Sequence, residues 1–94
     1  MREVVISSTL IDSEDSVVHL RIKQVDEKET LVNVAKRYAE NELQFSCVLI
    51  GHPADTDDEN DGKVVDHGED GVYFFFDGWV HKFEFIDSIR GRGL

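Results

Sequence analysis

The carboxylates of residues 53–71 are the side chains of this chain that could carry chemistry. The segment reads PADTDDENDGKVVDHGEDG, and its acids are Asp55, Asp57, Asp58, Glu59, Asp61, Asp66, Glu69 and Asp70. Its one base is Lys63, so the segment carries most of the formal net charge of −10. Dense carboxylates attract basic protein surfaces and cations and repel nucleic acid and anionic membranes. We therefore expect these eight acids to contact a basic partner.

Residues 57–69 approximate the loop of a calcium-binding EF-hand. Acidic side chains stand at positions 1, 3 and 5 of the loop, and Gly62 stands at position 6. Position 12 is Gly68, where the loop needs a bidentate Glu, and Glu69 comes one place late. We expect a solvated acidic loop that binds cations weakly, with specific calcium binding as an alternative.

Other patterns of metal or catalytic chemistry are not found in the sequence. His52 and His67 match no standard zinc spacing, and no pair of Cys accompanies them. Cys47 lies in the apolar run FSCVLI, which is typical of a small core residue rather than a reactive thiol. No phosphate-binding Gly-rich loop, G-x-S-x-G or H-E-x-x-H motif occurs. We expect no enzymatic activity, no metal and no cofactor.

The aromatic residues near the C-terminus could in principle stack on nucleic-acid bases. Such platforms accompany basic grooves, whereas this chain has a pI of about 4.6. The basic tail 90–94, RGRGL, is too short to compensate for this acidic character. We therefore expect Trp79 and the Phe residues to pack in the core and the protein not to bind DNA or RNA directly. We expect His81, which falls on the same face, to be buried and hydrogen-bonded.

Two alternating segments predict an antiparallel hairpin at the start of the chain. Residues 3–11 place Val4, Ile6, Ser8 and Leu10 on one side. In residues 17–25, the apolar side chains of Val18, Leu20 and Ile22 alternate with those of His19, Arg21 and Lys23. In a half-buried strand the apolar side faces the core, so we expect the three basic or imidazole side chains to face solvent.

The pattern then changes to a helical period. Residues 27–43 predict an amphipathic helix, with Asp26 and Glu29 as a capping box. Residues 45–50 form a continuous apolar run ended by Gly51, which is typical of a central strand. Lys63, Val64 and Val65 could form a short edge strand within the acidic segment.

Asp77-Gly78 between two aromatic strand-forming runs predicts a type I′ hairpin. A two-residue loop pairs Phe76 with Trp79, Phe74 with His81 and Val72 with Phe83. These side chains share one face with Phe85. The other face carries Tyr73, Phe75, Val80, Lys82, Glu84 and Ile86. We expect the first face to lie in the core.

The element order predicts an α+β domain with a mostly antiparallel sheet and one helix on one face. The order is ββαβ, the acidic loop and then the hairpin. In its first half it resembles the β-grasp order of ubiquitin-like folds. We expect the core to contain Val4, Ile6, Leu20, Ile22, Leu31, Tyr38, Val48, Leu49, Phe74, Phe83 and Phe85.

With 94 residues the chain fits a single domain, 1–94, in which 53–71 is an insertion and 90–94 a flexible tail. One Cys forms no internal disulfide, and we see neither a signal peptide nor a membrane-spanning run. A cytoplasmic location is the expectation.

In size and charge the chain resembles phage-encoded nucleic-acid mimics, such as anti-restriction and anti-CRISPR proteins and the uracil-glycosylase inhibitor. It is similar in the same respects to small acidic immunity proteins that neutralise nuclease toxins. The resemblance implies a non-enzymatic inhibitor whose carboxylates bind a basic, nucleic-acid-handling protein. The alternatives are a β-grasp-like interaction module and a calcium-binding domain formed by residues 57–69.

Overall fold

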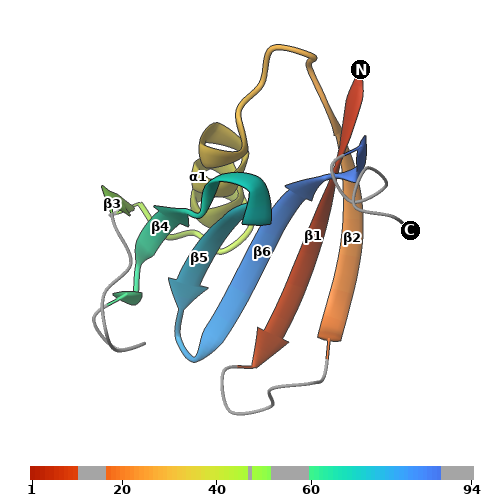
Figure 1. The fold of residues 1–94 in the computed structure, drawn as a ribbon. Coiled ribbons are helices and arrows are strands. Elements are labelled where there is room, and N and C mark those ends of the chain that lie inside the picture. The colour runs from red at the N-terminus through yellow and green to blue at the C-terminus, as the bar shows by residue number, and fades with distance from the viewer. Residues whose placement is uncertain (11–16, 47, 52–59, 88–94) are drawn as a thin grey trace.

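The structure, a computed structural model, describes residues 1–10, 17–46, 48–51 and 60–87. In chain order its elements are β1 (Arg2–Leu10), β2 (Val17–Val25), α1 (Leu31–Asn41), β3 (Leu49–Gly51), β4 (Lys63–Asp66), the 3-10 turn η1 (Gly68–Asp70), β5 (Val72–Phe76) and β6 (Trp79–Phe85). They form one six-stranded sheet with a single helix packed against it, which confirms the predicted α+β class (Figure 1).

The strand order across the sheet is β2-β1-β6-β5-β4-β3. Every neighbouring pair is antiparallel except β3 and β4, which run parallel. In a β-grasp fold the first and last strands pair in parallel, whereas here β1 pairs antiparallel with β6. The resemblance to a β-grasp therefore ends at the order of the first elements.

The β5–β6 hairpin has the predicted register. Val72 pairs with Phe83, and Phe76 pairs with Trp79 across the turn. Asp77 has φ of 52° and Gly78 has φ of 81°, as the two central residues of a type I′ turn require. The hairpin therefore presents the aromatic face predicted from its sequence to the core.

The predicted orientation of β2 is wrong. Ile6 of β1 is buried, and its partner in β2 is Arg21, so the basic side of β2 lies on the helix side of the sheet. Leu20 and Ile22 lie on the opposite side, with 63% and 56% of their surface exposed. A shift of one residue in register exchanges the two faces of a strand, and pairing with β1 sets that register.

The helix is shorter than predicted and has a different cap. It begins after Thr30, whose side chain accepts a hydrogen bond from the backbone N–H of Asn33 (3.2 Å). Asp26 instead accepts a bond from the backbone N–H of Lys28 (2.9 Å) in the preceding turn. α1 packs its Val34, Ala35, Tyr38 and Ala39 against β4, β5 and β6.

The apolar run 45–50 does not form a central strand. Gln44 has φ of 55°, and the Phe45 backbone N–H bonds to the carbonyl of Ala39 at the end of α1. The Phe45 ring then packs against the core, and the strand begins only at Leu49, which is 64% exposed at the sheet edge. Cys47 lies outside the described residues.

The inner position belongs to β4, which was expected at an edge. It lies between β3 and β5, and its Val64 and Val65 are fully buried. The part of the acidic segment from residue 60 onward therefore belongs to the sheet and to η1 rather than to an exposed loop.

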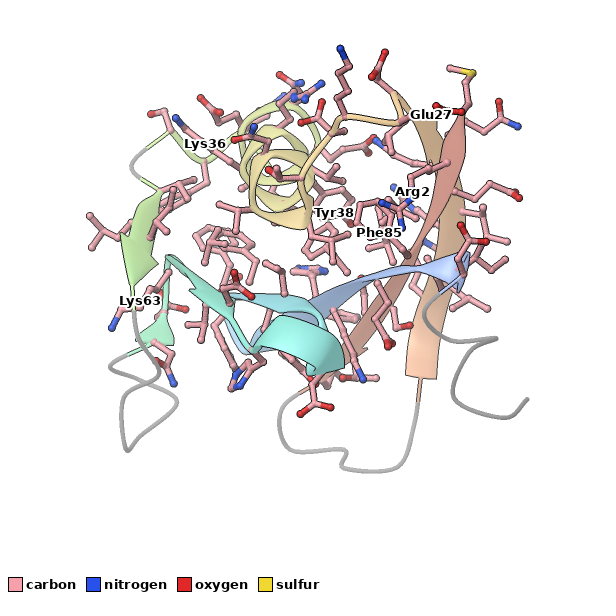
Figure 2. All side chains as sticks on the ribbon, turned by 45° about the horizontal axis from the view of Figure 1, so that its top comes forward. Arg2, Glu27, Lys36, Tyr38, Lys63 and Phe85 are labelled. Atoms are coloured by element: carbon pink, nitrogen blue, oxygen red, sulfur yellow. The ribbon has the colours of Figure 1, made fainter. Side chains whose placement is uncertain are left out.

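The core lies between α1 and the sheet. Figure 2 shows Tyr38 of α1 pointing at the sheet, where its ring meets the edge of Phe83 at a centroid distance of 5.5 Å. The buried cluster is Val4, Ile6, Val34, Ala35, Tyr38, Ala39, Val64, Val72, Phe74 and Phe83. Leu31, Val48 and Phe85 are partly buried against it, whereas Leu20, Ile22 and Leu49 are not core residues. No helix in the described ranges is long and apolar enough to cross a membrane.

Candidate functional site

The structure separates the acids expected to contact a partner. Asp61, Asp66 and Asp70 are described and exposed, and Glu69 lies in η1. The other four, Asp55, Asp57, Asp58 and Glu59, lie outside the described residues. Asp61 forms an isolated bridge with Phe75, and Asp66, at the end of β4, pairs with Val72, so these two lie about 10 Å apart along β5.

The carboxylates of Asp61 and Asp66, at the two ends of β4, each accept a hydrogen bond from the backbone. Asp61 accepts a hydrogen bond from the backbone N–H of Asp77 in the hairpin turn (2.8 Å). Asp66 accepts one from the backbone N–H of Gly68 (2.8 Å). In each case the acceptor is one carboxylate oxygen, Oδ1.

Strand β4 separates the two halves of residues 57–69, the segment whose sequence resembles an EF-hand loop. A calcium loop wraps its twelve residues around one ion, whereas residues 63–66 form an extended strand in which Val64 and Val65 are paired on both sides. Among the described residues, no group of three or more His, Cys, Asp or Glu side chains is placed to hold a metal ion.

A groove of about 380 Å³ lies between the start of α1 and η1. Glu29, Asp66 and Glu84 line it together with the apolar residues Leu31, Val32, Val72 and Phe85. The three carboxylates come from three distant parts of the chain. Only Asp66 belongs to the acidic segment, so sequence reasoning missed the other two.

The two other carboxylates of this acidic groove have cationic partners within the protein. Glu29 pairs with Arg37, and Glu84 pairs with Lys82 at 3.3 Å. Lys82 has a raised pKa: burial alone would lower it, but the nearby Tyr73 and Glu84 outweigh that effect. Within the described part of the chain, Asp66 forms no ion pair. Among the groove's carboxylates, Asp66 is therefore the one whose charge no described cation offsets.

Most of the described basic side chains outside the segment also have an acidic partner. Arg21 and Lys23 both pair with Glu42, at 3.0 and 2.8 Å. Arg2 lies 3.9 Å from the Asp87 carboxylate, and its guanidinium stacks over Phe85 (Figure 2). Asp61, Asp66 and Asp70 form no ion pair with any described residue. The acidic excess of the chain is therefore not cancelled at these three positions.

His81 is buried and hydrogen-bonded, as predicted. Its Nδ1 lies 2.6 Å from the hydroxyl oxygen of Ser8, and both residues are at most 5% exposed. Burial, with a smaller effect from Arg21, lowers the pKa of His81 to about 4, so the ring is neutral at pH 7. A nucleophilic serine must reach its substrate, and the burial of Ser8 is more consistent with a structural bond.

A second cavity of about 310 Å³ opens beside His81, where α1 ends. It is lined by Ser8, His19, Arg21, Tyr38, Leu43, Phe76, Asp77, Trp79 and His81. The lining comes from β1, β2, the region around the end of α1 and the β5–β6 hairpin. The predicted orientation of β2 placed His19 and Arg21 on the other face of the sheet.

Comparisons of the chain with protein-family models, with curated proteins and with solved structures each find no match.

Proposed function

We propose that this protein is a non-enzymatic binding protein that engages a basic, nucleic-acid-handling protein through residues 53–71. The partner contacts are the eight acids of that segment, and inhibition by imitation of nucleic-acid phosphates is the mode that their charge favours. Carboxylates that imitate phosphates would capture the Lys and Arg side chains of a nucleic-acid channel. They would also accelerate encounter through long-range attraction.

The acidic groove is the observation that carries this proposal. Lys and Arg place an apolar stem beneath a charged end, and the groove offers apolar walls from Val72 and Phe85 beside the Asp66 carboxylate. Arg37 and Lys82 neutralise the groove's other two acids. Asp66 is therefore the residue of the segment whose structure supports capture of a basic side chain.

The test compares charge variants of matched geometry. Asp66→Asn removes the charge but keeps the Oδ1 acceptor for the N–H of Gly68. Asp26→Asn is the matched control, because Asp26 is also exposed and also accepts a bond from the backbone N–H two residues later. Exposed substitutions of this kind shift stability within about ±0.5 kcal/mol, so binding changes can be read directly.

The protein is immobilised, and partners are captured from host lysate at low and moderate salt and identified by mass spectrometry. We expect a basic nucleic-acid-binding protein whose affinity falls at least about tenfold, or 1.4 kcal/mol, in a variant that combines Asp66→Asn with neutralised Asp57, Asp58, Glu59 and Asp61. Its salt dependence should also fall. Unchanged affinity and salt dependence in that variant would refute the proposal.

A second candidate function is a protein-interaction module that uses the sheet itself. β2 is an edge strand, and its Leu20 and Ile22 are exposed on the face that α1 does not cover. Open edges of this kind accept a further strand from a partner. A Leu20→Thr, Ile22→Thr variant would then lose the captured partner, and the charge variants would keep it.

A further inference from the structure

The second cavity combines aromatic rings with a cationic end. Trp79 and His81 lie nearly parallel, with an angle of 9° between ring planes and 6.4 Å between centroids. The Tyr38 ring is tilted by 56° to His81 at 5.3 Å. Parallel rings offer a planar ligand an offset stacking surface.

The register of the sheet builds the polar side of this cavity. Ser8 of β1 pairs with His19 of β2 on one side and with His81 of β6 on the other. Residues paired in this way point to the same face of the sheet. His19, Ser8 and His81 therefore form a row about 10 Å long, and Arg21 stands two residues beyond His19 on the same face.

The β2 end of the cavity is positive, although the chain as a whole is acidic. Arg21 and Lys23 share the single carboxylate of Glu42, which leaves one positive charge uncancelled. Arg21 Nη2 lies 3.1 Å from His19 Nε2. Lys23, and to a smaller extent Arg21, lower the pKa of the Glu42 carboxyl through their hydrogen bonds and positive charge.

The opposite end is acidic. Asp77 lines the cavity from the β5–β6 turn, where its side chain is exposed. Two strand spacings and several residues separate it from Arg21. The cavity therefore offers a cation at one end, a hydrogen-bond acceptor at the other and aromatic rings between them.

We propose that this cavity binds a small planar aromatic molecule that carries an anionic group at one end and a hydrogen-bond donor at the other. The ring stacks against Trp79, the anion meets Arg21, and the donor reaches Asp77. A volume of about 310 Å³ is at the lower end of the range for small-molecule sites, so the ligand is a single ring system or a mononucleotide.

Four compounds test the chemistry. 4-Aminobenzoate and AMP carry the anion, and 4-aminobenzamide and adenosine are their uncharged counterparts. Trp79 is the only Trp of the chain, so its indole N–H gives a single cross-peak in ¹H–¹⁵N NMR spectra. We expect saturable shifts of that cross-peak and at least about tenfold tighter binding of an anion than of its uncharged counterpart. The tighter of the two anions identifies the ligand as an aromatic acid or a mononucleotide.

Two variants distinguish a contact inside the cavity from attraction by a nearby positive charge. Arg21→Gln and Lys23→Gln each remove one positive charge, both side chains are 40% exposed, and both pair with Glu42. Only Arg21 lines the cavity. We expect Arg21→Gln to abolish the preference for the anion, and Lys23→Gln, which removes charge without removing a lining side chain, to reduce that preference less. Equal effects of the two variants, or no shift of the Trp79 cross-peak by either anion up to about 10 mM, would overturn the proposal.

Discussion

Titration of His81 should make the protein less stable at mildly acidic pH. In the folded protein its pKa is about 4, whereas an unperturbed His has a pKa of about 6.5. Above about pH 6.5 the ring is neutral in both the folded and the unfolded state, so it contributes no pH dependence. As the pH falls below that value the unfolded state binds a proton that the folded state does not, and the free energy of unfolding decreases.

The size of the effect follows from the two pKa values. Below both pKa values the free energy of unfolding is lower by about 3 kcal/mol, and at pH 5 it is lower by about 2 kcal/mol. The His81 ring borders a cavity that admits solvent, and screening by that solvent reduces the loss. We therefore expect about 1–2 kcal/mol at pH 5.

The assay is urea unfolding at several pH values between about 7.5 and 5, a range in which most carboxyl groups remain charged. His81→Gln cannot titrate there and measures the contribution of every other group. The difference between wild type and His81→Gln isolates the imidazole. His67→Gln, which removes an exposed imidazole, is the control substitution.

One result would refute the reasoning. If the free energies of unfolding of wild type and His81→Gln stay parallel within about 0.3 kcal/mol across this range, the folded pKa is not depressed. An NMR titration that gives His81 a pKa near 6.5 would lead to the same conclusion. The ring would then be hydrated rather than buried against Tyr38 and Phe74.

Further expected outcomes concern packing, backbone and charge. Phe83→Ala should cost about 3–5 kcal/mol in urea unfolding because Phe83 is fully buried, whereas Leu20→Ala should cost less than about 1 kcal/mol; equal costs would contradict the observed face of β2. Gly71→Ala should lower thermal stability, because φ is +99° and a Cβ would lie 2.6 Å from the Phe83 carbonyl oxygen; an unchanged melting temperature would argue against this approach. In carboxyl NMR titrations Glu42 should have a pKa below that of an ordinary Glu, and Lys23→Gln should raise it; no rise would show that the ion pair does not persist in solution.

Local patterns determined the elements whose conformation depends on their own residues. Asp77-Gly78 specifies a two-residue turn, and that turn fixes every cross-strand pair in β5 and β6. The helical period of residues 31–41 similarly fixed the buried face of α1, because the spacing of apolar side chains is set within one helix. Burial of His81 followed from its place on the hairpin face.

Only tertiary structure decided which face of β2 meets the helix. Alternation shows that the two sides of a strand differ, but both sides of β2 can be accommodated at an edge. Pairing of Arg21 with Ile6 and the ion pairs to Glu42 place the basic side inward. The sequence of residues 63–66 likewise does not specify the position of this strand in the sheet. β4 is an inner strand because it pairs with both β3 and β5.

The two candidate sites also depend on tertiary structure. The acidic groove brings Asp66 together with Glu29 and Glu84, and the aromatic cavity brings Arg21 together with Trp79. The sequence determines the charge and the aromatic content that make these sites chemically distinct. Their positions depend on strand order and register, which arise from contacts between residues far apart in the chain and leave no periodic signal in the sequence.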